Sequence, residues 1–281
     1  MTVVVPLIDL SAARSGPDAR FGEALVESGF VVLEGHRIPS ALWDRAATAA
    51  LRAFALAPDV KARYRGPDDG SQRGYLEMRT ALRDGRAALD RKECWHARRP
   101  GHRFANLFPA EAPELEPALL ALIDAFDALA ARILAGIDAF LGGTALAASA
   151  RDGDSVFRVN HYPNLGGSRD LRFAAHCDFD LITFLLGATA PGLEIEARDG
   201  HWHALTPSAS SIVVSAGDLL QVASGGRIPS ARHRVVTPTS PDGGRLSMVY
   251  FVAPRPDLVL AEGIVSGDVV DRRLRDAGYL R

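Results

Sequence analysis

The stretch RFAAHCDFDLITFLLGA, residues 172–188, places an acidic turn between two short runs, and the second run is rich in residues that favour β-strands. Similar short runs surround it on both sides and are separated by turns. They are SVFRVNHY (155–162), GLEIEAR (192–198), HWHALTP (201–207), SIVVSAGDLLQVA (211–223), RHRVVT (232–237) and RLSMVYFVA (245–253). This spacing, with Asp199-Gly200 as a hairpin signal and no helical pattern in between, predicts about eight strands in an antiparallel sandwich or jelly roll.

The chain before this region has mainly helical patterns. Helices are expected over 17–29, over 41–56 with Ser40 as N-cap, and over 113–141, where apolar residues recur at steps of three and four. The third helix is long enough to lie along the core as a buttress. Residues 61–112 are rich in Arg, Gly, Asp and Pro, so loops with one or two short strands are expected there.

Together these patterns predict a mainly β fold with flanking helices. We expect a single domain over 1–281: a mostly helical N-terminal region (1–150), a double-stranded β-helix (jelly roll) core (155–254) and a C-terminal tail (255–281). No internal repeat or change of composition separates a second domain.

Composition and charge limit the binding partners and the cellular compartment that can be expected for this protein. A formal net charge of -2 provides no basic field for nucleic acid, and no apolar stretch approaches the ~20 residues of a membrane span. The N-terminal segment lacks the pattern of a signal peptide, and the two cysteines form no metal or disulfide motif. We therefore expect a cytoplasmic protein that is monomeric or weakly homo-oligomeric and binds neither nucleic acid nor a membrane.

One His-x-Asp pair is a candidate for metal binding. If His176-Cys177-Asp178 is a strand, its first and third side chains point the same way. His233, in another strand-like run, would complete the two-histidine, one-carboxylate set that binds Fe(II) and leaves coordination positions open. Alone, such a pair is more often a surface or core feature.

A second pair with the same spacing is suited to an acid. Arg245 and Ser247 would also share a strand face, where the guanidinium fork matches a carboxylate and the hydroxyl adds a donor. Asn160 and Tyr162 form a third such pair. By contrast, His201 and His203 flank a hairpin turn with no carboxylate to complete a site, so a solvated strand is favoured for them.

The segment GDLLQVASGGRIPSARHRVV, residues 217–236, resembles the region of the second iron-binding histidine in the isopenicillin N synthase-like family of Fe(II)/2-oxoglutarate-dependent dioxygenases. The usual form is GDxLQxxSNGxxxSxxHRV, and Gly225 replaces its common Asn. Further family marks follow in order along nearly the whole chain: PLIDL (6–10), GFVVLEGHRIP (29–39), Lys92-Glu93, NHYP (160–163), HCD (176–178), PGLEIEARDGHWHALTP (191–207) and RLS (245–247).

The resemblance implies a role for each matching residue. His176, Asp178 and His233 match the iron ligands, Arg245 and Ser247 match the pair that binds the distal carboxylate of 2-oxoglutarate, and Asn160 and Tyr162 match residues that assist there. It also implies an oxidoreductase that uses Fe(II), 2-oxoglutarate and O2 to hydroxylate, desaturate or cyclise a small molecule, with 2-oxoglutarate converted to succinate. No catalytic group beyond the metal ligands is indicated, and a bacterial role in specialised metabolism, such as antibiotic biosynthesis, is expected.

The substrate site and two alternatives stay open at this stage. Family substrate contacts point to Arg73, Tyr75 and Phe179, although each side chain is also a normal surface or packing residue. One alternative is an isopenicillin N synthase-like oxidase that draws all electrons from its substrate and uses no 2-oxoglutarate. The other is a jelly roll that binds ligands without catalysis. A hydrolytic zinc enzyme is disfavoured because no motif places a general base.

Overall fold

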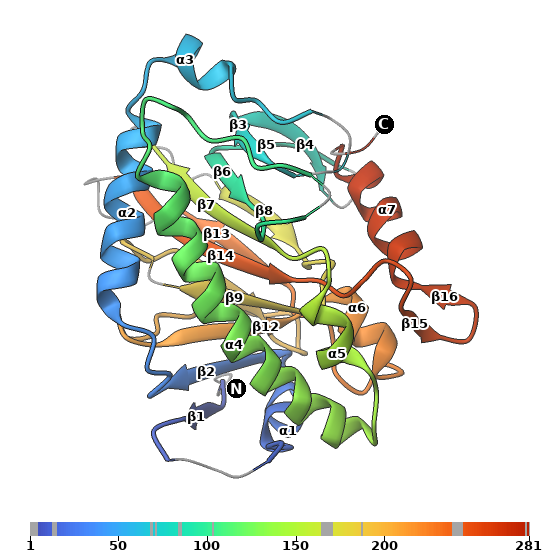
Figure 1. Cartoon of the computed structure of the whole chain (residues 1–281). Helices are drawn as coiled ribbons and strands as arrows, with labels where there is room; N and C mark the ends of the chain where they lie inside the picture. The colour runs from blue at the N-terminus through green and yellow to red at the C-terminus, as the bar shows by residue number, and fades with distance from the viewer. Residues whose placement is uncertain are drawn as a thin grey trace.

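The computed structural model describes residues 5–12, 16–67, 70, 72–83, 86–102, 104–163, 171–186, 188–237, 244–278 and 280, with the side chains of 79–90 left aside. Two sheets form its centre (Figure 1). The larger has the order β1 (Leu7–Asp9), β2 (Phe30–Glu34), β12 (Ile212–Ala216), β9 (Ile182–Leu186), β14 (Arg245–Val252), β7 (Val156–Tyr162), β6 (Glu93–Ala97), β3 (Gly74–Leu76). The smaller has the order β11 (Trp202–Ala204), β10 (Leu193–Glu196), β13 (His233–Val236), β8 (Leu171–His176).

Apolar side chains of the two sheets pack against each other. Tyr162 of the large sheet clusters with Phe173 and Val235 of the small one, and a second cluster joins Phe30 and neighbouring large-sheet residues to Ile195. Within each sheet the strands that belong to the jelly roll pair antiparallel. This confirms the predicted jelly-roll core with flanking helices.

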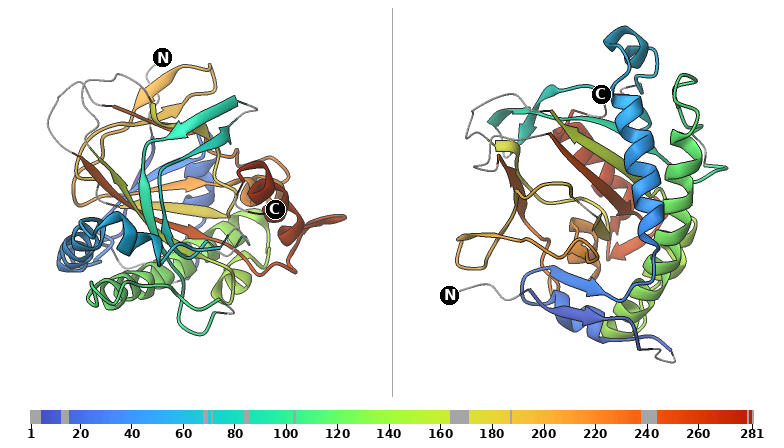
Figure 2. Two further views of the ribbon diagram at one scale, coloured as in Figure 1. Left: turned by 90° about the horizontal axis from the view of Figure 1, so that it is seen from above. Right: turned by 90° about the vertical axis from the view of Figure 1, so that its left-hand side faces the viewer.

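Helices cover the outer face of the large sheet. Helix α4 (Leu115–Leu141) lies on the sheet, and α1 (Arg20–Leu25), α2 (Ser40–Phe54) and α5 (Leu146–Arg151) pack against it, while the short α3 (Pro58–Ala62) lies beyond the end of α2. The long helix α4 runs across the sheet with α2 beside it (Figures 1 and 2). Its Phe126 contacts Phe157, Phe184 and Tyr250, with ring centroids 5.1–6.2 Å apart. The buttress predicted over 113–141 is therefore confirmed within two residues of its start.

Strand alternation divides β7 and β14 between two environments. Phe157 and Tyr250 face α4, so the residues next to them in sequence face the space between the sheets. The pairing places Arg245 opposite Tyr162 and Ser247 opposite Asn160. Directly opposed residues of an antiparallel pair lie on the same side, which puts these four side chains together on the interior face.

Several local expectations were wrong. The described residues of 61–112 form four strands: β4 (Arg79–Arg83) and β5 (Arg86–Asp90), which make a hairpin, together with β3 and β6. Strand β6 is buried along its whole length and carries polar residues with internal partners, so it shows no alternation of polar and apolar residues. The run GDLLQVA folds as helix α6 (Asp218–Ala223), because Leu219 and Leu220 are both buried after β12 ends.

The ends of two helices and the C-terminus also differ from expectation. Ser40 is the first helical residue and Pro39 occupies the N-cap position, without a side-chain cap. The helix expected over 17–29 is limited to Arg20–Leu25. The C-terminal tail contains a small hairpin, β15 (Val259–Ala261) and β16 (Ile264–Val265), followed by α7 (Ser266–Asp276). Among the described residues no helix is long and apolar enough to cross a membrane.

Candidate functional site

Two histidines meet because β8 and β13 are paired. His176 is the last residue of β8 and His233 the first of β13, and they are direct partners in the antiparallel register. Their ring centroids lie 4.3 Å apart. Asp178 follows in the loop after β8, so the expected strand alternation does not explain its position. Instead, its carbonyl oxygen accepts a hydrogen bond from the Asp218 amide (2.9 Å), and its Oδ2 accepts one from Thr183 Oγ1 (2.7 Å).

The donor atoms of these three residues converge. His176 Nε2 lies 3.6 Å from Asp178 Oδ1, and His233 Nε2 lies 3.9 Å from Asp178 Oδ2. Within the part of the chain that the structure describes, they form the one group of three potential ligands, with all donor atoms within 4.8 Å of one another.

Backbone carbonyls select the tautomer that a metal requires. Nδ1 of His176 donates to the Ala174 carbonyl (2.8 Å), and Nδ1 of His233 donates to the Ala231 carbonyl (3.0 Å). Each ring therefore presents its Nε2 lone pair toward Asp178, as in protein metal sites where the second ring nitrogen is held by a carbonyl. The donor set fits Fe(II) bound by two imidazoles and one carboxylate.

The carboxylate Asp178 has a second acid close by. Asp180 is buried, and its Oδ2 lies 2.9 Å from Thr183 Oγ1, the same hydroxyl that bonds Asp178. Burial and the charge of Asp178 raise the pKa of Asp180 well above its ordinary range.

A buried anion site lies on the interior face of β14 and β7. Arg245 is 3% exposed, and its Nε donates to the Ala190 carbonyl at 3.1 Å. Its Nη1 and the Oδ1 of Asn160 are buried without a hydrogen-bond partner among the described residues. Burial lowers the pKa of Arg245, but a guanidinium remains charged at physiological pH. An acid in this position would satisfy the unused donor and compensate the charge.

Tyr162 and Arg172 lie beside this guanidinium. The guanidinium carbons of Arg245 and Arg172 are 5.2 and 6.0 Å from the centre of the Tyr162 ring. Two positively charged side chains next to one buried ring make the site around Arg245 favourable for binding an anion.

A cavity of about 750 Å³ opens beside the histidine and aspartate. His176, Asp178 and the predicted substrate residue Phe179 line it. Its walls also include residues that the sequence did not single out. These are chiefly Arg158 and Phe251 from the large sheet, Arg98 directly after β6, and Val270 and Leu274 from α7. Arg158 shares strand alternation with Asn160 and Tyr162, so the pattern that identified those two residues was also the available signal for Arg158.

The other two predicted substrate residues are elsewhere. Arg73 donates from Nη1 to the Ala105 carbonyl (3.1 Å), and Tyr75 donates its hydroxyl to Glu93 Oε2 (2.6 Å) in the core. Burial and the hydrogen bond to Glu93 raise the pKa of Tyr75. Neither residue lines the cavity.

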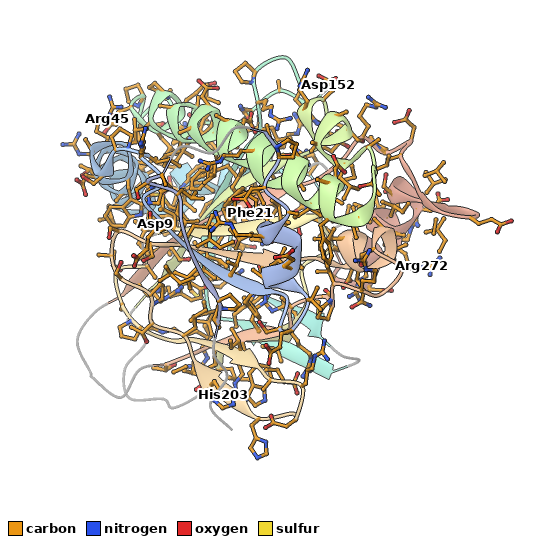
Figure 3. The ribbon with its side chains drawn as sticks, turned by 90° about the horizontal axis from the view of Figure 1, so that it is seen from below. Asp9, Phe21, Arg45, Asp152, His203 and Arg272 are labelled. Carbon is orange, nitrogen blue, oxygen red and sulfur yellow. The ribbon has the colours of Figure 1, made fainter. Side chains whose placement is uncertain are left out.

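The histidines expected to be structural lie away from this site. His161 points to the other face of β7, where its Nδ1 is 2.8 Å from Glu93 Oε1 and its ring stacks on Phe54. His201 has 78% of its side chain exposed, and His203 lies on the side of the molecule opposite α4 (Figure 3).

Comparisons with known proteins agree with this geometry. The model of the 2OG-Fe(II) oxygenase superfamily matches residues 153–254, and the N-terminal model of non-haem dioxygenases in morphine synthesis matches residues 5–115. Validamycin A dioxygenase of Streptomyces hygroscopicus subsp. limoneus is 30% identical over 92% of this chain and 80% of its own length. The chain belongs to the 2OG-Fe(II) oxygenase superfamily.

Other relatives extend the same conclusion. Gibberellin 2-beta-dioxygenase 3 of Arabidopsis thaliana is 28% identical over 90% of this chain and 76% of its own length. A solved structure from Caulobacter crescentus, of a protein assigned to the 2OG-Fe(II) oxygenase family, has a TM-score of 0.84 and 31% identity, covering 98% and 99% of the two chains. A full-length Neurospora crassa protein, solved in complex with alpha-KG, has a TM-score of 0.85 and 25% identity, covering 97% and 96%. This superfamily member is thus an Fe(II)- and 2-oxoglutarate-dependent oxygenase that uses O2 to oxidise a small molecule.

Proposed function

We propose that His176, Asp178 and His233 bind the Fe(II) of this oxygenase. The supporting observation is that two Nε2 atoms and a carboxylate converge while both Nδ1 hydrogens are held by carbonyls. When bound, Fe(II) supplies the activation of O2 that couples substrate oxidation to decarboxylation of 2-oxoglutarate.

The distal carboxylate of 2-oxoglutarate binds Arg245 and Ser247 in this proposal, with Asn160 and Tyr162 completing the site. The Nη1 of Arg245, which has no hydrogen-bond partner among the described residues and is buried on the same interior face as the other three side chains, supports this assignment. Arg245 fixes one end of the cosubstrate, so that its 2-oxoacid end is directed toward the metal ligands. Substrate enters the cavity of about 750 Å³, where Phe179 contacts it.

Anaerobic titration with Fe(II) and 2-oxoglutarate tests the assignment. The wild type is expected to develop the visible charge-transfer absorption of an iron and 2-oxoacid complex, and His176→Ala and Asp178→Ala are expected to lose it. A matched control is His201→Ala, which removes an exposed imidazole. Full absorption in the Asp178 variant would refute the ligand set. Succinate formed per O2 consumed distinguishes this chemistry from an oxidase that uses no 2-oxoglutarate.

We further propose a cytoplasmic enzyme, monomeric or weakly self-associating, with no nucleic-acid partner. The net charge of -2 and the two free cysteines support this setting. The similarity to validamycin A dioxygenase favours a role in specialised metabolism. Size-exclusion chromatography with light scattering measures the oligomeric state directly.

A further inference from the structure

Asp218, the first residue of α6, joins two of the chain segments that carry the proposed metal ligands. Its amide donates to the Asp178 carbonyl (2.9 Å), and its Oδ1 accepts a hydrogen bond from Ser230 Oγ (2.6 Å). Ser230 lies three residues before His233 in the chain. Asp218 therefore contacts the loop of the carboxylate ligand through its backbone, and the segment that leads to a histidine ligand through its side chain.

The loop of the carboxylate ligand packs tightly against the start of α6. The Gly217 amide donates to the Leu181 carbonyl (3.0 Å). The Leu219 amide donates to the Asp180 carbonyl (3.1 Å). A Cβ atom at Gly217 would collide with the carbonyl oxygen of Asp180, so no side chain fits between the two segments. Because interiors are close-packed, the loop cannot shift without displacing Asp218 as well.

The carboxylate of Asp218 also binds the C-terminal helix α7. Arg273 of that helix donates from Nε to Asp218 Oδ2 (2.7 Å), and its Nη2 bonds the same oxygen. The Asp218 side chain is 18% exposed and that of Arg273 is 42% exposed, so water screens this ion pair only in part. Of the ion pairs between residues that the structure describes, it alone connects α7 to another element.

The same helix forms part of the wall of the substrate cavity. Val270 and Leu274 of α7 line the cavity together with His176 and Asp178. Phe179, which directly follows the carboxylate ligand in sequence, packs against the cluster around the buried Leu274. Helix α7 therefore touches the loop of the carboxylate ligand through this apolar contact and is bound to it through Asp218.

We propose that Arg273 is a positioning residue that couples α7 to the metal site, so that Fe(II) binding and the docking of α7 stabilise each other. This inference rests on the proposed function, since it takes His176, Asp178 and His233 as the iron ligands. Metal binding fixes the Asp178 loop, the loop fixes Asp218, and Asp218 fixes α7 through Arg273. Coupling between two sites is reciprocal, so a docked α7 favours metal binding to the same extent. The cavity wall formed by α7 is then held most firmly in the metal-loaded enzyme.

Two other roles of Arg273 lead to different results. If the ion pair only stabilises α7, its loss loosens the helix equally with and without metal. If Arg273 acts mainly through its charge, its loss leaves the Asp218 carboxylate uncompensated near the metal, and Fe(II) then binds more tightly.

Hydrogen–deuterium exchange of the full-length protein, with and without Fe(II) under anaerobic conditions, tests the coupling. In the wild type, Fe(II) is expected to slow exchange both in the loop 176–180 and in α7. The effect in α7 is expected to be about two- to fivefold, because coupling through Arg273 cannot exceed the strength of a partly exposed ion pair. In Arg273→Met the loop should still respond to Fe(II), whereas α7 should not.

Two further measurements locate the effect. Arg272→Met makes the same substitution at an exposed residue of α7 outside the cavity lining, and it is expected to match the wild type (Figure 3). The affinity for Fe(II), titrated anaerobically in the presence of 2-oxoglutarate, is expected to fall about two- to fivefold in Arg273→Met and to stay unchanged in Arg272→Met.

The outcomes separate this inference from the function on which it rests. If the wild type forms no iron and 2-oxoglutarate complex, the proposed function fails. If the complex forms but α7 shows no response to Fe(II), or if Arg273→Met shows the same response as the wild type or binds Fe(II) more tightly, only the inference is refuted. Should Arg273→Met not fold, the wild type in about 1 M NaCl replaces it, because salt screens a partly exposed ion pair. An α7 response that is unchanged by salt would then refute the inference.

Discussion

Replacing Arg245 by Gln gives a quantitative test of how 2-oxoglutarate is held. The guanidinium is 3% exposed, so water neither screens nor replaces its interaction with the cosubstrate. Hydrogen bonds to charged groups contribute about 1.5–3 kcal/mol each, and the guanidinium can donate two of them to the distal carboxylate. A glutamine amide would donate only one hydrogen bond, and that bond would be weaker because the amide is neutral. The net loss is therefore about 2–4 kcal/mol, which corresponds to an increase in the KM for 2-oxoglutarate on the order of 30- to 1000-fold.

The assay compares 2-oxoglutarate with 2-oxopentanoate, which has a methyl group in place of the distal carboxylate. Wild-type enzyme should prefer 2-oxoglutarate strongly, whereas Arg245→Gln should use the two compounds with similar KM. The kcat is expected to change less than KM, because this contact is made equally in the ground state and the transition state. The same preference in wild type and variant would refute the assignment of Arg245.

Three further contacts can be tested by single substitutions. Thr183→Val removes the hydroxyl that bonds Asp178, so Fe(II) affinity should fall roughly 10- to 100-fold in an anaerobic titration, and an unchanged affinity would contradict the role of this bond. Phe126→Ala should lower the free energy of unfolding in urea by about 3–5 kcal/mol because its ring lies among three buried aromatic rings, and a loss below about 1 kcal/mol would contradict that packing. Burial raises the pKa of Glu93, but hydrogen bonds from His161, Lys61 and Tyr75 outweigh that effect and lower the pKa from 4.5 to about 2. The ionised Glu93 therefore stabilises the folded state fully above pH 4.5, and this contribution is lost as the pH falls toward 2. In that pH range the free energy of unfolding should fall more for the wild type than for Glu93→Gln. If the two proteins lose stability in parallel as the pH falls, this carboxylate does not contribute to the stability of the fold.

Strand alternation and family resemblance explain how much of the site was predictable. The pairs Asn160/Tyr162 and Arg245/Ser247 are side by side because each pair shares one strand face and the two strands are neighbours in register. A single sequence does not show that these two strands are neighbours, because nothing in either stretch indicates its pairing partner. The family resemblance supplied the strand pairing.

Other parts of the site depend on contacts distant in sequence. Asp178 reaches the histidines from a loop held by the Asp218 amide and Thr183, not by strand alternation. Strand β6 has no apolar alternation because its polar residues have buried partners such as Lys61, which bonds Glu93 at 2.6 Å. The helix α7 has only a narrow apolar side, and its place on the cavity could not be inferred without knowing where the chain turns back.

The two faces of β7 also limit how this enzyme can diversify. A deletion or insertion of one residue within the strand would exchange its faces, moving Phe157 and Val159 inward and Arg158 and Asn160 against helix α4. Core packing, cosubstrate binding and the cavity would all be lost in a single step. We therefore expect that natural or laboratory evolution of new substrates proceeds by substitutions at positions such as Arg158 and by changes in length in the segments around α7, while the length of β7 stays fixed.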